Sequence, residues 1–419
     1  MERLISINLI FCKMNDCFFA NQDIGILGFN TRPIACSVAR QGGKVFVSDY
    51  WGDSDLQPCV KKWVSVLNPQ PGYRQRKKLD RPMQEYLVQN FLEYYGHSDY
   101  DHIFITGGFD DYTIYLKELE KRYRISGNSS KQMKLARDFQ KVNTLATELG
   151  LRVPLQKLSD SLDTSLSIAD EIGYPCILRA LESGGGSGIR FIKDQDDLIT
   201  KYKKIQPGSR MRIQQYVTGK DASVSLLSTG TKAMSLSYHG QMIGFPSAGL
   251  KCNFTFSGNF MPFSIESETR KKLTRTTERM MTELGLVGSN GIDVVLDDAE
   301  RIWFMEINPR FQATLEMLEY AGKVSITKLH VDACEGYLPR QSPKFTAACK
   351  MIVYSQVKGV VGDLSRIPET VDRTPIGVHV NRYDPICSLI YTGISINEVY
   401  KKAIHSSEEV RRLVEPMKD

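Results

Sequence analysis

The sequence predicts a chain of mixed α/β and α+β class, 419 residues long and organised in structural blocks. Residues 23–55 follow a strand–helix–strand pattern, which is typical of a parallel sheet. Short β-like runs then alternate with amphipathic helices up to residue 336, and the remaining residues carry further strand-like and helical patterns. We expect an N-terminal extension at 1–22, an α/β domain at 23–128, an α+β domain at 129–343 and a small C-terminal α+β domain at 344–419.

The α/β domain begins with an apolar strand and a turn at Gly28. Pro33 suits the first turn of the following helix, and a second strand ends at the acidic Asp49. A dinucleotide site would need three spaced glycines in this turn, whereas only Gly28 is present. The pattern favours a packed domain whose strand ends help to hold a substrate over a nicotinamide or flavin site. Residues 1–22 lack a pattern and are expected to be disordered, with Met14 as an alternative start.

The composition is that of a globular protein, with 42% apolar and 24% charged residues and a formal net charge of +6. The densest basic run, residues 74–81, has no interleaved aromatic residues, so we expect a solvated surface and no nucleic-acid partner. No stretch approaches the roughly 18 apolar residues of a membrane helix, and Lys13 interrupts the short apolar start. We therefore expect no membrane partner and a cytoplasmic location. The nine cysteines show no CxxC spacing, which predicts buried free thiols rather than disulfides or a zinc site.

A glycine-rich loop follows an apolar strand between residues 173 and 189. The strand carries the cation Arg179. Backbone N–H groups of such a loop can surround phosphate oxygens, because glycine permits close approach and unusual dihedral angles. No Gly-Lys-Ser/Thr follows, so this is no Walker loop, and a flexible surface linker is the alternative interpretation. The loop residues are Gly184, Gly185, Gly186, Ser187 and Gly188.

Two carboxylates occur in a predicted β-hairpin between residues 291 and 316. Asp293 starts one apolar strand and Glu306 lies on the returning strand, which brings the two carboxylates near each other. Asn308 follows on the same face. Two carboxylates and an amide oxygen among apolar neighbours favour a hard cation such as magnesium, and Arg310 could hold a phosphoryl or carboxylate oxygen. A salt-bridged hairpin explains the carboxylate pair alone more simply, but the preceding strand cation and glycine loop favour the metal site.

Together these motifs resemble those of the ATP-grasp superfamily, and the chain is similar to archaeal-type carboligases related to biotin carboxylase. The resemblance extends from Asp23 to the C-terminus and rests on the glycine loop and on Glu-x-Asn-Pro-Arg at 306–310. It implies an ATP-grasp fold with a parallel-sheet pre-ATP-grasp domain, a two-lobed nucleotide-binding core and a small C-terminal domain. The glycine-flap lobe of that core is expected at 155–217.

The resemblance also implies roles for single residues. Lys141, Arg179 and the glycine loop would contact the phosphates of ATP, and Arg310 and Arg179 would be catalytic. A metal ion, Mg²⁺ or alternatively Mn²⁺, would be held by Asp293, Glu306 and Asn308. Gln214, Gln215 and Val217 would contact the adenine, and Asp221 would lie near the ribose. Without the resemblance, this segment is most simply a core strand followed by a turn. The family usually has lysine at the position of Arg179 and glutamate at that of Gln214, so we expect ATP binding with changed geometry.

We therefore expect an ATP-dependent ligase that phosphorylates a carboxylate and lets an amine capture the acyl phosphate. Two alternatives remain: a carboxylase that phosphorylates bicarbonate, and a nucleotide-binding protein without catalysis. FSGNFMPF at 256–263 resembles a substrate-side segment of the related carboligases, which implies amino-acid addition to a pterin- or furan-type coenzyme precursor. The expected partners are small-molecule carboxylate and amine substrates, and the resemblance is compatible with a homodimer.

Overall fold

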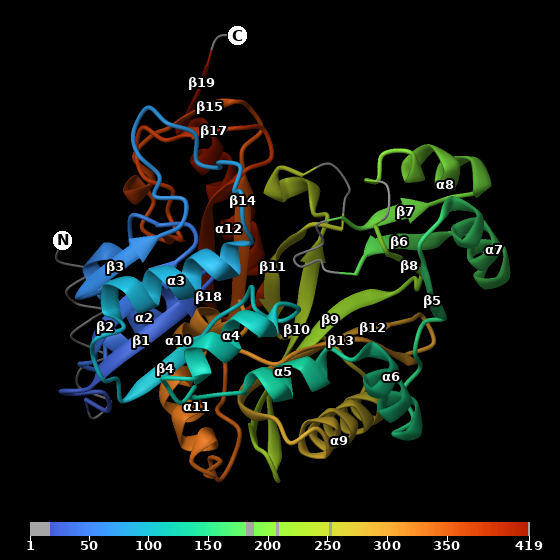
Figure 1. The fold of residues 1–419 in the computed structure, drawn as a ribbon, viewed down its shortest axis with the longest axis horizontal. Helices are drawn as coiled ribbons and strands as arrows, with labels where there is room; N and C mark the ends of the chain where they lie inside the picture. The colour runs from blue at the N-terminus through green and yellow to red at the C-terminus, as the bar shows by residue number, and fades with distance from the viewer. Residues whose placement is uncertain (1–16, 182–187, 207–208, 251–253, 418–419) are drawn as a thin grey trace.

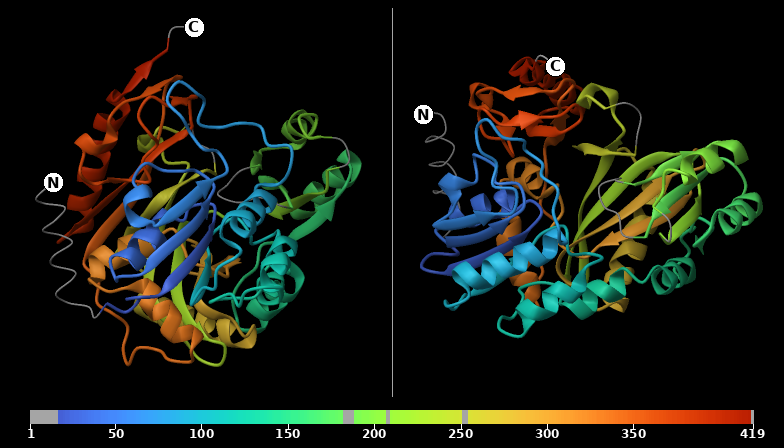
Figure 2. Two further views of the ribbon diagram at one scale, coloured as in Figure 1. Left: turned by 60° about the vertical axis from the view of Figure 1, so that its left-hand side comes forward. Right: turned by 45° about the horizontal axis from the view of Figure 1, so that its top comes forward.

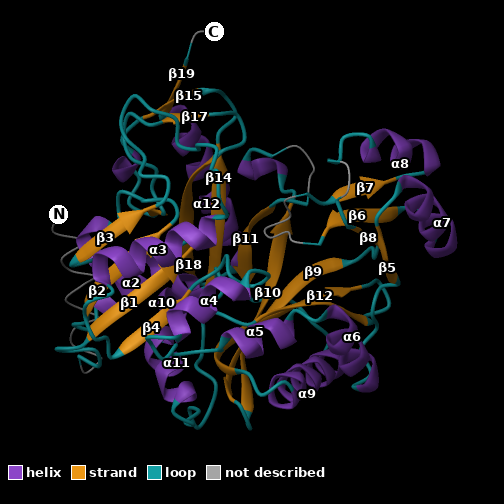
Figure 3. Ribbon diagram, viewed as in Figure 1, coloured by secondary structure: helices purple, strands orange, loops and turns teal. Residues whose placement is uncertain are grey.

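The computed structural model of the chain describes residues 17–181, 188–206, 209–250 and 254–417. Figure 1 shows a parallel sheet near the N-terminus, a large central sheet and a smaller lobe that stands apart on the right. Helices border each of these sheets (Figure 3). No helix in the described part of the chain has both the length and the apolar character that crossing a membrane requires.

The N-terminal part is a four-stranded parallel sheet, as the sequence predicts. Its strands are β1 (Asp23–Gly28), β2 (Lys44–Asp49), β3 (Lys62–Ser65) and β4 (His102–Ile105), and its helices are α2 (Arg32–Ala39), α3 (Met83–Tyr95) and α4 (Thr113–Glu120). The strand order is β3-β2-β1-β4, with every pair parallel. Central β1 buries Ile24, Ile26 and Leu27 completely, because it has a neighbour on each side and helices over its faces. The carboxyl ends of β1 and β4 therefore meet at one edge of the sheet.

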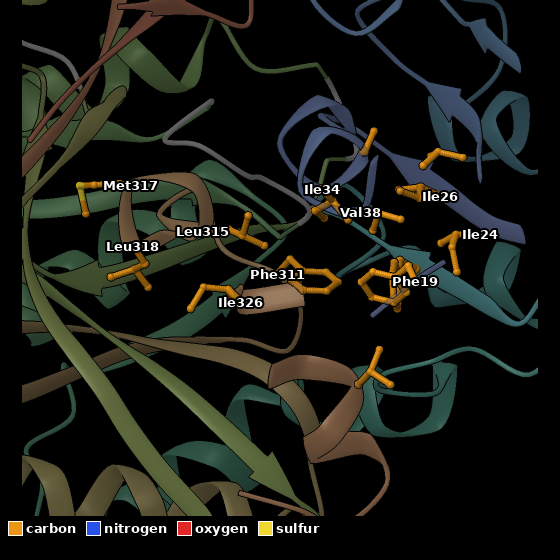
Figure 4. Packing of buried hydrophobic residues seen from close by; sticks show 14 of the residues in the cluster. Phe19, Ile24, Ile26, Ile34, Val38, Phe311, Leu315, Met317, Leu318 and Ile326 are labelled. Atoms are coloured by element: carbon orange, nitrogen blue, oxygen red, sulfur yellow. The ribbon is translucent and has the colours of Figure 1, made fainter. Parts of the chain in front are cut away.

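The folded part of the chain begins before residue 23. Phe19 is completely buried and packs in the same apolar cluster as Ile24 (Figure 4). Residues 17–22 thus belong to the N-terminal domain, because an aromatic side chain in a core fixes the backbone on both sides of it. This corrects the expected extension at its C-terminal end. Residues 1–16, including Met14, lie outside the described residues.

The N-terminal domain shares this apolar cluster with the central part of the molecule. Figure 4 shows Ile34 and Val38 of α2 on one side and Phe311, Leu315 and Ile326 on the other. The last two belong to α10 (Leu315–Gly322) and α11 (Ile326–Cys334). Burial of apolar surface between the two parts stabilises their relative position.

The central part is an antiparallel sheet of eight strands in the order β13-β12-β9-β10-β11-β14-β18-β16. The strands are β9 (Lys220–Thr229), β10 (Ala233–Ile243), β11 (Phe256–Met261), β12 (Val287–Leu296), β13 (Ile302–Asn308), β14 (Ala347–Tyr354), β16 (Thr370–Val371) and β18 (Pro385–Gly393). β14 continues the sheet by pairing with β11, so the expected boundary at residue 343 falls within one hydrogen-bonded ladder. The last block also forms a small separate sheet of β15 (Gly359–Val361), β17 (His379–Val380) and β19 (Val414–Pro416).

The smaller lobe is a four-stranded antiparallel sheet with two helices on it. Its elements are β5 (Gln156–Ser159), α7 (Leu162–Ile172), β6 (Cys176–Ala180), β7 (Arg190–Ile192), α8 (Gln195–Tyr202) and β8 (Met211–Gln215). The strand order is β5-β8-β6-β7. Helices α5 (Ser130–Ala136) and α6 (Phe139–Glu148) lead into the lobe, and residues 216–219 lead from it into β9. Both views of Figure 2 show the lobe standing to one side of the central sheet.

The expectation that all cysteines are free is wrong. Cys36 in α2 and Cys59 in the 3₁₀ helix η1 (Gln57–Cys59) form a disulfide across 23 residues of sequence, with their Cα atoms 4.8 Å apart. The chain returns to α2 after β2, and this return brings the two thiols together. Of the other described cysteines, Cys176, Cys349 and Cys387 are buried, Cys334 is half-buried and Cys17 is exposed.

Candidate active site

The hairpin of β12 and β13 carries the predicted acidic pair. Asp293 lies directly opposite Glu306 in the register of the two strands, as the sequence predicts. β12 begins at Val287, so Asp293 lies in mid-strand rather than at the strand's start. The register shifts between Asp293 and Val294, and such a bulge re-aims the neighbouring side chains. The two carboxylates therefore lie side by side on one face of the central sheet.

Asp293 is held by two side-chain amides. Its Oδ1 accepts a hydrogen bond from Gln241 Nε2 at 3.1 Å, and its Oδ2 accepts one from Asn308 Nδ2 at 3.0 Å. Burial and the negative charge of Glu306 raise the pKa of Asp293 to about 7. Two neighbouring carboxylates that resist joint ionisation favour a cation between them.

Glu306 is paired with arginines in the described structure. Arg137 Nη1 lies 3.2 Å from its Oε2, and Arg179 Nη2 lies 4.0 Å from the same atom. Burial opposes ionisation of Glu306, but these two guanidinium groups outweigh it and hold the pKa below its usual value. Arg137 also forms a two-pronged ion pair with Asp111, at 2.8 and 3.0 Å. Glu306 is thus the carboxylate on which cations from two parts of the molecule converge.

The sheet of the smaller lobe presents two arginines side by side. Arg179 of β6 lies directly opposite Arg212 of β8, so both side chains project from the same face. The guanidinium group of Arg212 lies over the ring of Phe139, 4.1 Å from its centroid. Burial, together with the charges of Arg179 and Arg137, lowers the pKa of Arg212 to about 10. The wall formed by this lobe is therefore strongly positive.

A cavity of about 640 Å³ separates this positive wall from β13. Arg179 and Arg212 line it from the smaller lobe, Arg137 from the end of α5, and Glu306 from β13. Asp111, in the loop after β4, closes it on the side of the N-terminal domain. Three parts of the chain that are distant in sequence thus enclose one charged cavity, whose size suits a small-molecule ligand.

Arg310 connects the acidic hairpin with the edge of the parallel sheet. Its Nη2 donates to Asn308 Oδ1 at 3.1 Å, and its Nε donates to both oxygens of Asp110, each at 3.0 Å. Burial opposes ionisation of Asp110, but Arg310 and Arg137 hold the pKa of this carboxyl below its usual value. These contacts fix the guanidinium group of Arg310 beside the carboxyl end of β4.

The remaining predicted residues lie in several different places. Lys141 is not brought to the cavity: its side chain is 68% exposed and lies 3.8 Å from Asp138. Gln214 is buried on β8, whereas Gln215 accepts a hydrogen bond from the Leu155 backbone N–H at 3.2 Å. Val217 lies in the link between the two sheets, and Asp221 is exposed on β9. Gly188 is described, with φ +76°, whereas Gly184, Gly185, Gly186 and Ser187 lie outside the described residues.

Sequence reasoning missed Arg137, Arg212, Asp111 and Gln241. Arg212 had a detectable signal, because it alternates with Gln214 on a strand and must share its face. Arg137 had none: it caps the C-terminal end of α5, and only the approach of that helix to β13 brings it to Glu306. Gln241 likewise reaches Asp293 from two strands away.

The acidic hairpin fits a magnesium ion. No group of three or more acidic, histidine or cysteine side chains suited to a metal gathers anywhere in the described ranges. A metal at Asp293, Glu306 and Asn308 would therefore have few protein ligands. Mg²⁺ tolerates this well, since it usually keeps several waters and binds through one or two carboxylates and phosphate oxygens.

Residues 138–314 match the family model of the ATP-grasp domain. This range includes the whole smaller lobe and the β12–β13 hairpin. The biotin carboxylase domain of 2-oxoglutarate carboxylase from Hydrogenobacter thermophilus, solved with MgADP, ADP and bicarbonate, has a similar fold, with a TM-score of 0.70 at 15% identity. The similarity covers 93% of this chain and 89% of that one.

Two further solved structures resemble the chain to a similar degree. Biotin carboxylase from Campylobacter jejuni in complex with β-γ-ATP has a TM-score of 0.68 at 16% identity, over 91% of this chain and 89% of that one. N5-carboxyaminoimidazole synthetase from Staphylococcus aureus in complex with ADP has a TM-score of 0.69 at 16% identity, over 94% and 98%. At these identities the similarity concerns the fold. The chain has the ATP-grasp fold and contains an ATP-grasp domain at residues 138–314.

Proposed function

We propose that the protein is an ATP-dependent ligase that joins a carboxylate to an amine through an acyl phosphate, with ATP and Mg²⁺ bound in the cavity at Glu306. One observation carries the proposal: Glu306, which lies opposite Asp293 in the hairpin, lines a cavity of about 640 Å³ together with Arg137, Arg179 and Arg212. Phosphoryl transfer needs positioning and charge neutralisation above all, and this arrangement supplies both. The ADP, MgADP and β-γ-ATP held by the three similar structures support the choice of nucleotide and metal.

The reaction consists of two balanced steps. A carboxylate oxygen of the substrate attacks the γ-phosphorus of ATP, the bond from that phosphorus to the bridging oxygen breaks, and ADP and an acyl phosphate form. The amine nitrogen then attacks the acyl carbon, inorganic phosphate leaves, and the amine loses a proton. Mg²⁺ bound by Asp293, Glu306 and Asn308 would neutralise the charge of the phosphates. Arg179 would bind the phosphoryl oxygens from the smaller lobe.

Arg310 supplies a further positioned cation beside the acidic hairpin. Asp110 and Asn308 hold its guanidinium group, so little reorganisation accompanies binding of an anion there. Because Arg310 borders the carboxyl end of the parallel sheet, we infer that the substrate carboxylate binds between Arg310 and the nucleotide. The edges of parallel sheets where strands end are common ligand sites.

The test is the Glu306→Ala variant. We expect it to abolish ADP release with any substrate pair that supports turnover, because it removes one of the two proposed carboxylate ligands of the metal and the carboxylate that Arg137 and Arg179 both contact. Glu283→Ala is the matched control, since Glu283 is an exposed residue of α9 (Ser267–Glu283) paired with Arg279. Product formation by Glu306→Ala at the control's rate would rule out the proposed role of the hairpin.

Carboxylation is the second candidate. It is favoured by the similarity to two structures whose names describe biotin carboxylases, one of them with bound bicarbonate. In that reaction bicarbonate would take the place of the carboxylate substrate. Turnover with bicarbonate as the sole carboxylate would establish this reading, whereas turnover in bicarbonate-free buffer would establish amide formation.

The finer identity of the substrates rests on the resemblance to carboligases. We infer a coenzyme precursor as carboxylate and an amino acid as amine, and a screen of ADP release over pairs of such compounds would identify them. Binding of ATP without ADP release in any mixture would instead support a nucleotide-binding protein without catalysis.

A further inference from the structure

We propose that Arg137 and Arg212 act with Arg179 as a three-arginine site for the terminal phosphates of the nucleotide, in the place expected for Lys141. The inference rests on the proposed function and assigns two residues that the sequence motifs do not indicate. In this assignment the phosphates are bound by side chains from three separate elements, namely the end of α5, β6 and β8.

The arginines of the cavity repel one another. Arg179 and Arg212 are directly opposite each other on neighbouring strands, and like charges in such pairs are destabilising. Arg137 adds a third positive charge on the same cavity. Apposed cations at a partly buried site indicate an anionic ligand that offsets them.

Among the side chains that the structure describes, carboxylates compensate two of the three arginines but not Arg212. Glu306 contacts Arg137 and Arg179, and Asp111 contacts Arg137. Within the described residues, no ion pair links Arg212 to a carboxylate, and the buried Nε atoms of Arg179 and Arg212 have no hydrogen-bond partner. Unpaired buried charge is expensive, and phosphate oxygens at the exposed edges of these guanidinium groups would reduce the cost.

The side chain of Arg212 is already oriented before a ligand binds. Phe139 holds its guanidinium plane at 4.1 Å, which limits the rotamers that binding must freeze out. A planar guanidinium group with parallel N–H donors binds phosphate in a two-pronged manner. Phe139 and Arg212 both line the cavity.

Lys141 is in a different environment. It lies two residues beyond Phe139 on α6, with its ammonium group beside Asp138 and two thirds of its side chain in solvent. It does not line the cavity. An exposed, strongly hydrated ammonium group contributes little to binding unless it moves.

The experiment compares nucleotide affinities of single variants by calorimetry, with ATP, AMP and inorganic tripolyphosphate as probes in the presence of Mg²⁺. We expect Arg212→Gln and Arg137→Gln to weaken ATP binding by about ten- to a hundredfold, the range for one hydrogen bond to a charged group. AMP binding should change much less, because AMP lacks the terminal phosphates. Arg212→Lys keeps the positive charge but loses the forked guanidinium group. Its affinity for ATP should therefore lie between those of the unaltered protein and Arg212→Gln.

Two further variants complete the test. Lys157→Gln is the matched control, because Lys157 lies on β5 between the cavity-lining Gln156 and Leu158 and projects from the other face. Lys141→Gln tests the competing assignment, and we expect it to stay within about twofold of the unaltered protein. Each variant is checked for an unchanged thermal unfolding midpoint.

The outcomes separate the two proposals. Loss of ATP binding in Lys141→Gln but not in the arginine variants would overturn the three-arginine site and leave the ligase proposal intact. Failure of the unaltered protein to bind ATP would overturn the ligase proposal. In that case, tripolyphosphate binding by the unaltered protein that is lost in Arg212→Gln would still support the three-arginine site. Absence of tripolyphosphate binding to the unaltered protein would overturn the three-arginine site as well.

Discussion

Burial shifts the pKa values of two residues on one face of the central sheet in opposite directions. It raises the pKa of the Asp293 carboxyl to about 7 and lowers the pKa of the His239 imidazole to about 3, because it disfavours the charged form of each. His239 is completely buried, with Nε2 2.6 Å from Ser237 Oγ and Nδ1 3.4 Å from Ser223 Oγ. Ser223 in turn lies opposite Asp293. The neutral imidazole is therefore a structural part of the floor beneath the acidic hairpin.

The lowered pKa of His239 predicts acid sensitivity. The folded protein keeps the imidazole neutral while the unfolded chain protonates it below its usual pKa of 6.5, so its contribution to stability is present above pH 6.5 and is lost as the pH falls. We expect a loss of about 1.4 kcal/mol per pH unit from this group. Urea unfolding at several pH values would show this loss in the unaltered protein and not in His239→Gln. Equal pH slopes for the two proteins would contradict the assignment.

At the scale of elements, α5 positions Arg137 at its C-terminal end. The helix begins at a capping box in which Ser129 and Gln132 exchange hydrogen bonds between their side chains and backbone N–H groups. The Gln132 side chain also donates to the Gly285 carbonyl oxygen, at the end of α9. One short helix is thus anchored at its start to the central domain and delivers a cation at its end.

Removal of this cap is expected to destabilise the protein. Ser129→Ala should lower the free energy of unfolding by about 1 kcal/mol, because the backbone N–H of Gln132 loses its acceptor. Lys131→Ala, at an exposed position of the same helix, should change it by no more than about 0.5 kcal/mol. Chemical denaturation of both variants measures the difference. An equal effect of the two substitutions would show that the cap contributes nothing.

At the scale of the whole molecule, Arg32 ties three parts of the chain together. From the start of α2 it donates through Nη1 to Glu316 Oε1 of α10 at 2.7 Å, and through Nε to Asp372 Oδ1 in the loop after β16 at 2.8 Å. Lys350 of β14 lies 3.2 Å from Asp372. Burial opposes ionisation of Glu316, but Arg32 holds the pKa of this carboxyl below its usual value. The N-terminal domain is thus docked by ionic contacts beside its shared apolar core.

Loss of the Arg32–Glu316 ion pair should lower the free energy of unfolding more than loss of a surface ion pair. Glu316 and Arg32 are almost fully buried, so Glu316→Ala leaves an incompletely compensated charge and should destabilise the protein by about 3 kcal/mol. Glu398→Ala, which removes a partly exposed pair with Lys402 on α12 (Ile396–Arg412), should cost no more than about 0.5 kcal/mol. Thermal and urea unfolding measure both. Asp55 Oδ2 also lies 3.5 Å from Arg32 Nε. A loss of stability for Glu316→Ala as small as that of the control would mean that Asp372 and Asp55 together compensate the charge of Arg32 without Glu316.

Local patterns predicted the parts of the fold in which contacts are close in sequence. The parallel start of the chain follows from apolar runs, Gly28 and Pro33, and the pairing of Asp293 with Glu306 follows from a short turn between two apolar strands. Alternation along a strand also explains why Arg179 faces the cavity. Such features depend on backbone geometry and side-chain period, which a sequence carries directly.

The sequence by itself determined the ATP-grasp class and the acidic hairpin, because both are encoded in motifs of neighbouring residues. Only the tertiary structure decided that Phe19 belongs to the core, that Cys36 meets Cys59, and that Arg137 rather than Lys141 reaches the cavity. These contacts join elements whose separation along the chain carries no periodic signal. They depend on how helices dock on sheets, which burial of apolar surface over the whole molecule determines.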